Sequence, residues 1–266
     1  LYSDDNEAAL AHVITAVRRW SQMPLGIQLC HAGRKASSLE PWNGGALIPA
    51  DSGGWRPVAP SAVPQSPDEP PPEALDETGL RRIRNAFATS TRRADRVGLE
   101  AMELHFAHGY LVHQFLSPLS NRRTDRYGGS IENRMRFALE VFDAVRQVWP
   151  AQKPLGVRLS ATDWIEGGWD LDSSVALAHQ LKARGCDWID CSSGGNMLTS
   201  PPVGLTVPNV ATRISGQKPS SNPRPACLPE APETRALSPP GPGFSPSPCH
   251  FSAAWARMTA PSAVIP

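Results

Sequence analysis

The segment HFAHGY at residues 105–110 places two histidines and a tyrosine within one short stretch of chain. His105 and His108 could donate two hydrogen bonds to one developing oxyanion, and Tyr110 could supply a proton. Two donors and one acid suit the formation of an enolate. The same spacing also fits a packed histidine pair. It fits a metal triad with His113 less well, because no carboxylate is placed to complete that site.

Gln28 and Arg158 are the other polar side chains that could bind a ligand, and each interrupts a short apolar run. A guanidinium inside a protein needs an anionic or electron-rich partner, such as a bound cofactor. An internal ion pair of Arg158 with Glu103 or Asp190 would satisfy the same need. Gln28 offers a donor and an acceptor suited to an imide-like ring edge, and a purely structural role also fits it.

Composition and missing motifs exclude several classes of function. The chain has 266 residues, 40% of them hydrophobic, and its 8 Trp add to a large potential core. Its net charge of +1 and the lack of long like-charged runs predict no nucleic acid or membrane partner. No dinucleotide fingerprint, Walker A loop or GxSxG elbow occurs. Five Cys without CxxC spacing fit reduced thiols, so we expect a cytoplasmic protein.

Helical and strand patterns alternate along the first 200 residues. Helices are predicted from residue 3, from 80 to about 96, from 130 to before 150 and from about 172 to 185, and strands within 25–31, 101–109, 155–161 and 186–195. This order predicts right-handed βαβ crossovers and a parallel sheet.

Three polar residues share one phase on these strands. Gln28, His105 and Arg158 each lie near a strand's carboxyl end, on the face opposite the large apolar side chains. In a doubly wound sheet they would face packed helices, whereas in an eightfold barrel they would point into the lumen near its mouth. The predicted fold is therefore α/β, a partial (β/α)8 TIM barrel.

Two segments interrupt the pattern. Residues 36–75 are Pro-rich and far longer than an ordinary strand-to-helix connection, which is typical of a functional cap or a disordered segment. After residue 200 come 15 of the 28 prolines and no Asp. That composition predicts a disordered tail.

Three segments resemble the Old Yellow Enzyme family of flavin-dependent ene reductases, most closely its bacterial xenobiotic-reductase-like branch of NADH:flavin oxidoreductases and NADPH dehydrogenases. They are GIQLCHAGRKAS at 26–37, ELHFAHGYLVHQFLSPLSNRRTDRYGGSIENRMRF at 103–137 and GVRLSATDWIEGGWD at 156–170. The resemblance covers residues 1 to about 200. It implies an FMN-containing barrel, reduced by NADPH or NADH, that passes hydride to the β-carbon of an α,β-unsaturated carbonyl compound.

The resemblance also implies roles for five residues. Gln28 and Arg158 would bind the FMN ring edge, with Arg158 favouring negative charge on the reduced flavin. His105 and His108 would hold the substrate carbonyl, and Tyr110 would deliver the proton to the α-carbon. The partners implied are a small-molecule enone and, as in many family members, further copies of the chain.

The family's pattern divides the chain at residue 206. Residues 1–206 correspond to a partial FMN-binding barrel, about strands 3 to 6, and residues 207–266 to a Pro/Ser-rich disordered or frameshifted tail. Family members have two further strands before this region and two after it, the latter holding the FMN phosphate. The alternative is a truncated, catalytically inactive partial barrel that does not bind FMN alone.

Overall fold

The computed structural model describes residues 1–197 and 263–264, and it confirms the predicted alternation of helices and strands. The helices are α1 (Asp4–Arg18), α2 (Glu77–Arg96), α3 (Leu111–Leu116), α4 (Ile131–Arg146) and α5 (Leu171–Ala183). The strands are β1 (Gly26–Cys30), β2 (Val58–Ala59), β3 (Glu73–Ala74), β4 (Ala101–Phe106), β5 (Leu155–Ser160), β6 (Trp188–Ser192) and β7 (Ala263–Val264).

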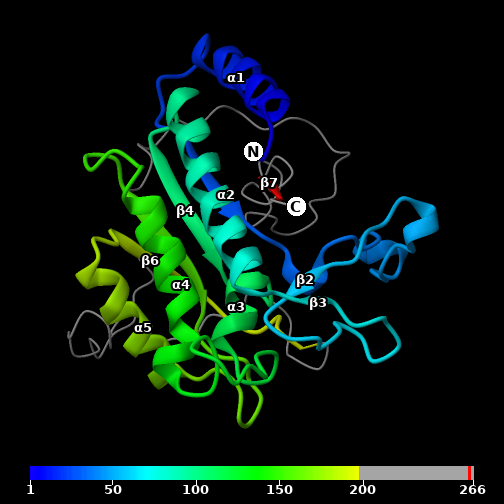
Figure 1. The fold of residues 1–266 in the computed structure, drawn as a ribbon. Helices are drawn as coiled ribbons and strands as arrows, with labels where there is room; N and C mark the ends of the chain where they lie inside the picture. Colours follow the sequence, from blue (N-terminus) through cyan, green and yellow to red (C-terminus); the bar gives the residue numbers. More distant parts are fainter. Residues whose placement is uncertain (198–262, 265–266) are drawn as a thin grey trace, which may run out of the picture.

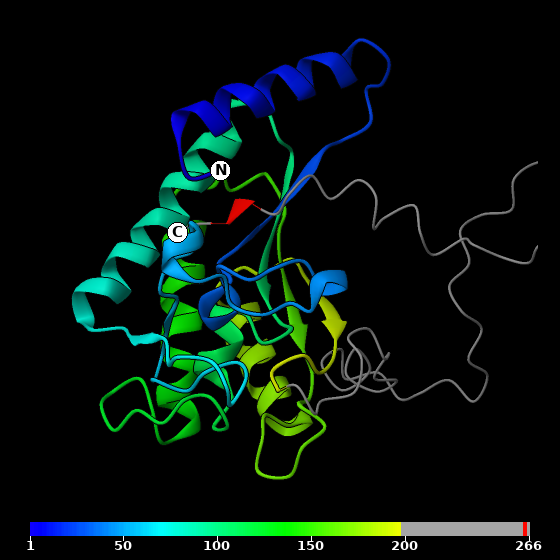
Figure 2. The same cartoon turned by 90° about the vertical axis from the view of Figure 1, so that its right-hand side faces the viewer.

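Five strands form one parallel sheet in the order β6-β5-β4-β1-β7. Helices α2 and α4 lie against one face of this sheet (Figures 1 and 2). Buried residues of α5 belong to the same apolar core. Because the described helices that pack on the sheet do so from one side, the architecture is a section of a barrel wall, as predicted, and not a doubly wound sheet.

The two faces of the sheet differ in polarity. The outer face is fully buried and apolar, and its residues pack with Phe87, Phe142 and Leu177 of the helices; they are Leu29, Leu104, Phe106, Val157 and Leu159. The inner face carries half-buried polar side chains, namely Gln28, Glu103, Arg158 and Asp190. This alternation follows from the two-residue period of a strand, and it places the polar side chains on the face predicted from the sequence.

Short polar side chains cap the start of α1, α2, α4 and α5, whereas α3 begins after Tyr110 without such a cap. The side chains that accept a hydrogen bond from the backbone N–H three residues later are those of Ser3, Asp76, Ser130 and Asp170. Each satisfies one amide that the first helical turn leaves without a partner. Over the described residues, none of the helices is both long and apolar enough to cross a bilayer.

The tail prediction for residues 207–266 falls almost entirely outside the described residues. The exception is β7, which pairs with β1 through Leu29↔Ala263 and Cys30↔Val264.

The Pro-rich excursion at 36–75 is folded and projects from the barrel wall (Figure 1). It contains two short 3-10 helices, Pro41–Asn43 and Ala50–Ser52, and its strands β2 and β3 pair in parallel. Trp42 and Trp55 within it are exposed. The segment is therefore a folded arm, and residues next to β2 and β3 form its base against the rest of the chain.

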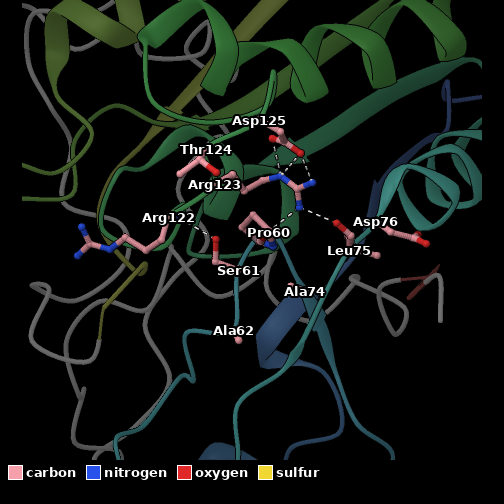
Figure 3. A pocket seen from close by; sticks show the side chains of 10 residues that line it. All are labelled: Pro60, Ser61, Ala62, Ala74, Leu75, Asp76, Arg122, Arg123, Thr124 and Asp125. Carbon is pink, nitrogen blue, oxygen red and sulfur yellow. Dashed lines mark hydrogen bonds and ion pairs between the residues drawn. The ribbon is translucent and has the colours of Figure 1, made fainter.

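Arg123 anchors this base to the loop between α3 and α4. Its guanidinium donates to the carbonyl oxygens of Pro60 at 2.9 Å and Leu75 at 2.6 Å, and it also pairs with Asp125 (Figure 3). The contacts border a hollow of about 430 Å³. The side chain of Arg122 points away from this network (Figure 3).

Replacement of Arg123 by Met is expected to lower the free energy of unfolding by about 1–3 kcal/mol, because two carbonyls lose a charged donor. Urea denaturation measures the change. Arg122→Met is the matched control, since the Arg122 side chain is exposed and should leave stability unchanged. Equal effects of the two substitutions would refute the anchoring role.

Candidate active site

His105, His108 and Tyr110 come together at the carboxyl end of β4. The Nε2 atom of His105 lies 3.1 Å from Nδ1 of His108. The ring centroid of His105 lies 4.8 Å from that of His108 and 4.8 Å from that of Tyr110. The three side chains singled out from the sequence therefore form one cluster.

Hydrogen bonds assign the ring protons of this histidine pair. The N–H of Ala107 donates to Nδ1 of His105 at 3.1 Å, so His105 carries its proton on Nε2 and donates it to His108. His108 then carries its proton on Nε2, which lies 2.6 Å from Oγ of Ser192. Both rings are neutral Nε2–H donors, arranged in series in this structure. A ligand oxygen that accepts from both rings would have to replace both internal acceptors, Nδ1 of His108 and Oγ of Ser192.

Burial keeps both rings neutral. It lowers the pKa of His105 to about 3, with His108 and Arg158 adding to the effect. It also lowers the pKa of His108 to about 3, again with the positive charge of Arg158 contributing. Burial raises the pKa of Tyr110, so its hydroxyl keeps its proton. The cluster thus offers two neutral donors and one weak acid.

Arg158 lies beside the histidines on the inner face. It pairs in register with His105 on one side and Asp190 on the other. Its Nε lies 3.4 Å from Oδ2 of Asp190, yet that buried Nε forms no hydrogen bond with the described residues. The side chain is 34% exposed. Arg158 therefore has the expected internal counter-ion, and its guanidinium also has unused capacity to donate.

Gln28 lies one row deeper on the same face. Its Nε2 donates to Oε1 of Glu103 at 2.7 Å, while the indole of Trp188 donates to the other oxygen at 3.0 Å. Gly156 leaves room for that indole, because a Cβ there would lie 1.9 Å from the ring. Within the described part of the chain no hydrogen bond involves Oε1 of Gln28, which remains able to accept one.

Two cationic side chains that sequence reasoning missed, the buried Arg34 and the half-buried Lys35, join the loops around the cluster. Lys35 Nζ donates to the carbonyl oxygen of His108 at 2.8 Å and to that of Gly195. Arg34 donates to the carbonyls of Asn196 and, at 3.1 Å, Pro64. Burial lowers the pKa of Lys35 to about 8. The Gly-Arg-Lys sequence directly after a predicted strand is the signal that could have identified them.

The histidine triad considered as a metal site does not assemble. The Nδ1 atom of His113 accepts the N–H of Gly109 at 2.9 Å, and its Nε2 faces Asp163 at 3.2 Å. Across the residues described, no group of three or more His, Cys, Asp or Glu side chains is arranged to hold a metal ion. His113 belongs instead to a buried pair behind the cluster.

Comparison with known proteins gives concordant matches. The model of the NADH:flavin oxidoreductase / NADH oxidase family matches residues 1–219. An NADH:flavin oxidoreductase of Gibberella zeae is 43% identical over 209 residues, and the match covers 73% of this chain and 50% of that protein. An NADPH dehydrogenase of Bacillus subtilis is 40% identical over 194 residues, covering 73% of this chain and 52% of its own.

Solved structures agree with these matches. Morphinone reductase superposes with a TM-score of 0.62 at 31% identity, over 81% of this chain and 58% of its own. The chain thus spans about half the length of the curated relatives it matches.

Proposed function

The chain belongs to the NADH:flavin oxidoreductase / NADH oxidase family, and from this premise we propose that it forms the substrate-binding half of an FMN-dependent oxidoreductase. The hydride donor would be NADPH or NADH. The reaction would be reduction of the activated C=C bond of an α,β-unsaturated carbonyl compound. One observation carries the proposal: two neutral histidine donors and a protonated tyrosine share a cluster beside an arginine on the inner face of the sheet.

The inner face fits a flavin ring edge. An imide edge presents carbonyl acceptors and one N–H donor, which need protein donors and an acceptor in return. Arg158 has a buried Nε without a hydrogen-bond partner among the described residues. Gln28 Oε1 makes no hydrogen bond with the described residues and can accept one, while its amide nitrogen is held by Glu103. Gln28 and Arg158 would therefore hold FMN, and Arg158 would stabilise negative charge on its reduced form.

The reaction adds one hydride and one proton across the C=C bond. Bound FMN would supply the hydride chemistry between the nicotinamide and the β-carbon. His105 and His108 would each donate a hydrogen bond from Nε2–H to the substrate oxygen and stabilise the negative charge that develops there. Tyr110 would release its hydroxyl proton to the α-carbon and recover a proton from solvent. Neutral histidines suit this role, because they stabilise the enolate without protonating it prematurely.

Titration of the purified 266-residue chain with FMN tests the proposal. We expect quenching of flavin fluorescence and a shift of its visible absorption, saturating at one FMN per chain. Arg158→Met should weaken binding by about tenfold or more, since a charge-assisted hydrogen bond is lost. Arg92→Met on the exposed face of α2 is the matched control.

One outcome of the FMN titration would refute the proposed function. If FMN binds neither to the chain alone nor to the chain supplied with the flanking barrel strands of a relative, the proposal is wrong. The alternative, a catalytically inactive partial barrel that does not bind FMN, would then be the correct description. Binding only after the strands are supplied supports the proposal for the assembled protein.

A further inference from the structure

Two buried side chains of α3 hold the peptide groups of Gly109, the residue between His108 and Tyr110. His113 Nδ1 accepts the Gly109 N–H at 2.9 Å, and Gln114 Nε2 donates to the Gly109 carbonyl at 2.7 Å. Both side chains are fully buried. The N–H belongs to the peptide shared with His108, and the carbonyl to the peptide shared with Tyr110. The two side chains therefore restrain the backbone on both sides of Gly109.

The turn needs such restraint because its conformation is demanding. His108 has a φ of 58° and Gly109 a φ of 70°. A Cβ at Gly109 would lie 2.3 Å from the carbonyl oxygen of Gly195. A non-glycine residue at positive φ costs free energy, so this conformation persists only where surrounding contacts impose it.

Asp163 determines which nitrogen of His113 can accept. Since Nδ1 receives the Gly109 N–H, the ring proton must be on Nε2, which faces Oδ1 of Asp163 at 3.2 Å. Both side chains are 0% exposed. A carboxylate at Nε2 favours this tautomer over the one protonated on Nδ1.

The carboxylate of Asp163 is itself held in place. Its Oδ2 accepts from the hydroxyl of Ser117 at 2.6 Å and from the N–H of Trp169 at 2.8 Å. Burial alone would raise the pKa of Asp163, but His113, Ser117 and Trp169 outweigh it and lower that pKa. Asp163 is thus ionised, with two hydrogen bonds on Oδ2, whereas Oδ1 lies at ion-pair distance from His113 Nε2 and accepts no hydrogen bond from the described residues.

We propose that Asp163 and His113 are positioning residues that set the geometry of the turn carrying His108 and Tyr110. Asp163 fixes the tautomer of His113, His113 holds the Gly109 N–H, and the adjoining peptides place the donor and the acid. The catalytic consequence rests on the proposed function, whereas the tautomer and the hydrogen bond do not.

Asp163→Asn separates this role from simple packing, because it preserves volume. An amide nitrogen facing His113 would force the proton onto Nδ1, against the Gly109 N–H. The opposite amide orientation would place the nitrogen against the Trp169 N–H. Either arrangement leaves two donors facing each other, which costs the desolvation of a buried polar group.

NMR of the chain labelled with ¹⁵N-histidine tests the assignment directly. His113 is expected to show a protonated Nε2 and a bare Nδ1, and Asp163→Asn should reverse or mix these states. The Gly109 amide signal should shift upfield in His113→Leu, which removes the acceptor, and return towards the wild-type position in His113→Asn. The carboxamide oxygen of Asn lies the same number of bonds from the backbone as Nδ1. His179→Leu on the exposed face of α5 is the control.

Kinetics of the flavin-loaded protein provide the second measurement. His113→Leu and Asp163→Asn should slow alkene reduction about tenfold or more, as expected for a misplaced catalytic group, with flavin reduction by NADPH preserved. His113→Asn should recover most of the rate.

Two results would overturn the inference: a wild-type His113 protonated on Nδ1, or a Gly109 amide signal that does not respond to His113→Leu. If the wild-type chain shows the expected tautomer but neither binds FMN nor reduces alkenes, the proposed function fails while the positioning of the turn stands. If the His113→Leu chain does not fold, the NMR spectra of His113→Asn and Asp163→Asn test the inference instead.

Discussion

Tyr110→Phe is expected to slow alkene reduction by about 10²-fold or more, because a general acid contributes that much to a proton-transfer step. Flavin reduction by NADPH should stay close to the wild-type rate, since that half-reaction needs no proton from Tyr110. The substitution removes one oxygen and keeps the ring, whose centroid lies 4.8 Å from that of His105. Stopped-flow absorption of the flavin measures each half-reaction separately.

The pH dependence of the same step gives an independent check. Burial raises the pKa of Tyr110 above its ordinary value of 10.0, so the alkene-reduction rate of the wild-type protein should not fall between pH 7 and 10 through loss of this proton. The control for Tyr110→Phe in the half-reaction measurements is Tyr2→Phe, since Tyr2 is 53% exposed. Equal losses in both half-reactions of Tyr110→Phe would rule out a proton-donor role and indicate a general disturbance of the site.

Most of the fold could be predicted because its signals are local. Ser130 and Asp170 cap α4 and α5, and two-residue alternation marks β4 and β5. Helix α3 was missed for a physical reason. All six of its residues are buried, so LVHQFL shows no apolar stripe from which a helical period could be recognised. Strand β7 was missed because two residues carry no period at all.

The strand part of the site could also be predicted, since phase alone places Gln28, His105 and Arg158 on one face. The loop part could not. Lys35 and Asp163 take their roles from contacts with residues far along the chain, such as Gly195 and His113. Spacing suggested His113 as a third metal ligand; only the fold reveals the carboxylate behind it. Sequence periodicity records which face a residue occupies, but not which loop lies against it.

Acidification from pH 7 to pH 5 is expected to destabilise the chain by about 2 kcal/mol for each deeply buried histidine. His31 and His105 are 3% and 5% exposed. Burial lowers the pKa of His31 to about 4 and that of His105 to about 3, from an ordinary 6.5. Between these values the unfolded chain binds protons that the folded chain does not, so stability rises with pH from about 4 to 6.5 and is lost as pH falls through this window.

Replacement of His31 isolates the contribution of one buried histidine to this pH dependence of stability. Its Nδ1 accepts the Gly33 N–H at 3.0 Å, and its buried Nε2 has no hydrogen-bond partner among the described residues. His31→Asn keeps an acceptor for Gly33 and removes the titrating ring. Urea denaturation at pH 7 and pH 5 should therefore show a smaller loss of stability for His31→Asn, by about 2 kcal/mol. The control, His179→Asn at an exposed position, should lose as much stability between pH 7 and pH 5 as the wild-type chain. If His31→Asn kept the full pH dependence of stability, the folded chain would have to allow His31 to accept a proton. Burial of the His31 ring would then not be the cause of the acid destabilisation.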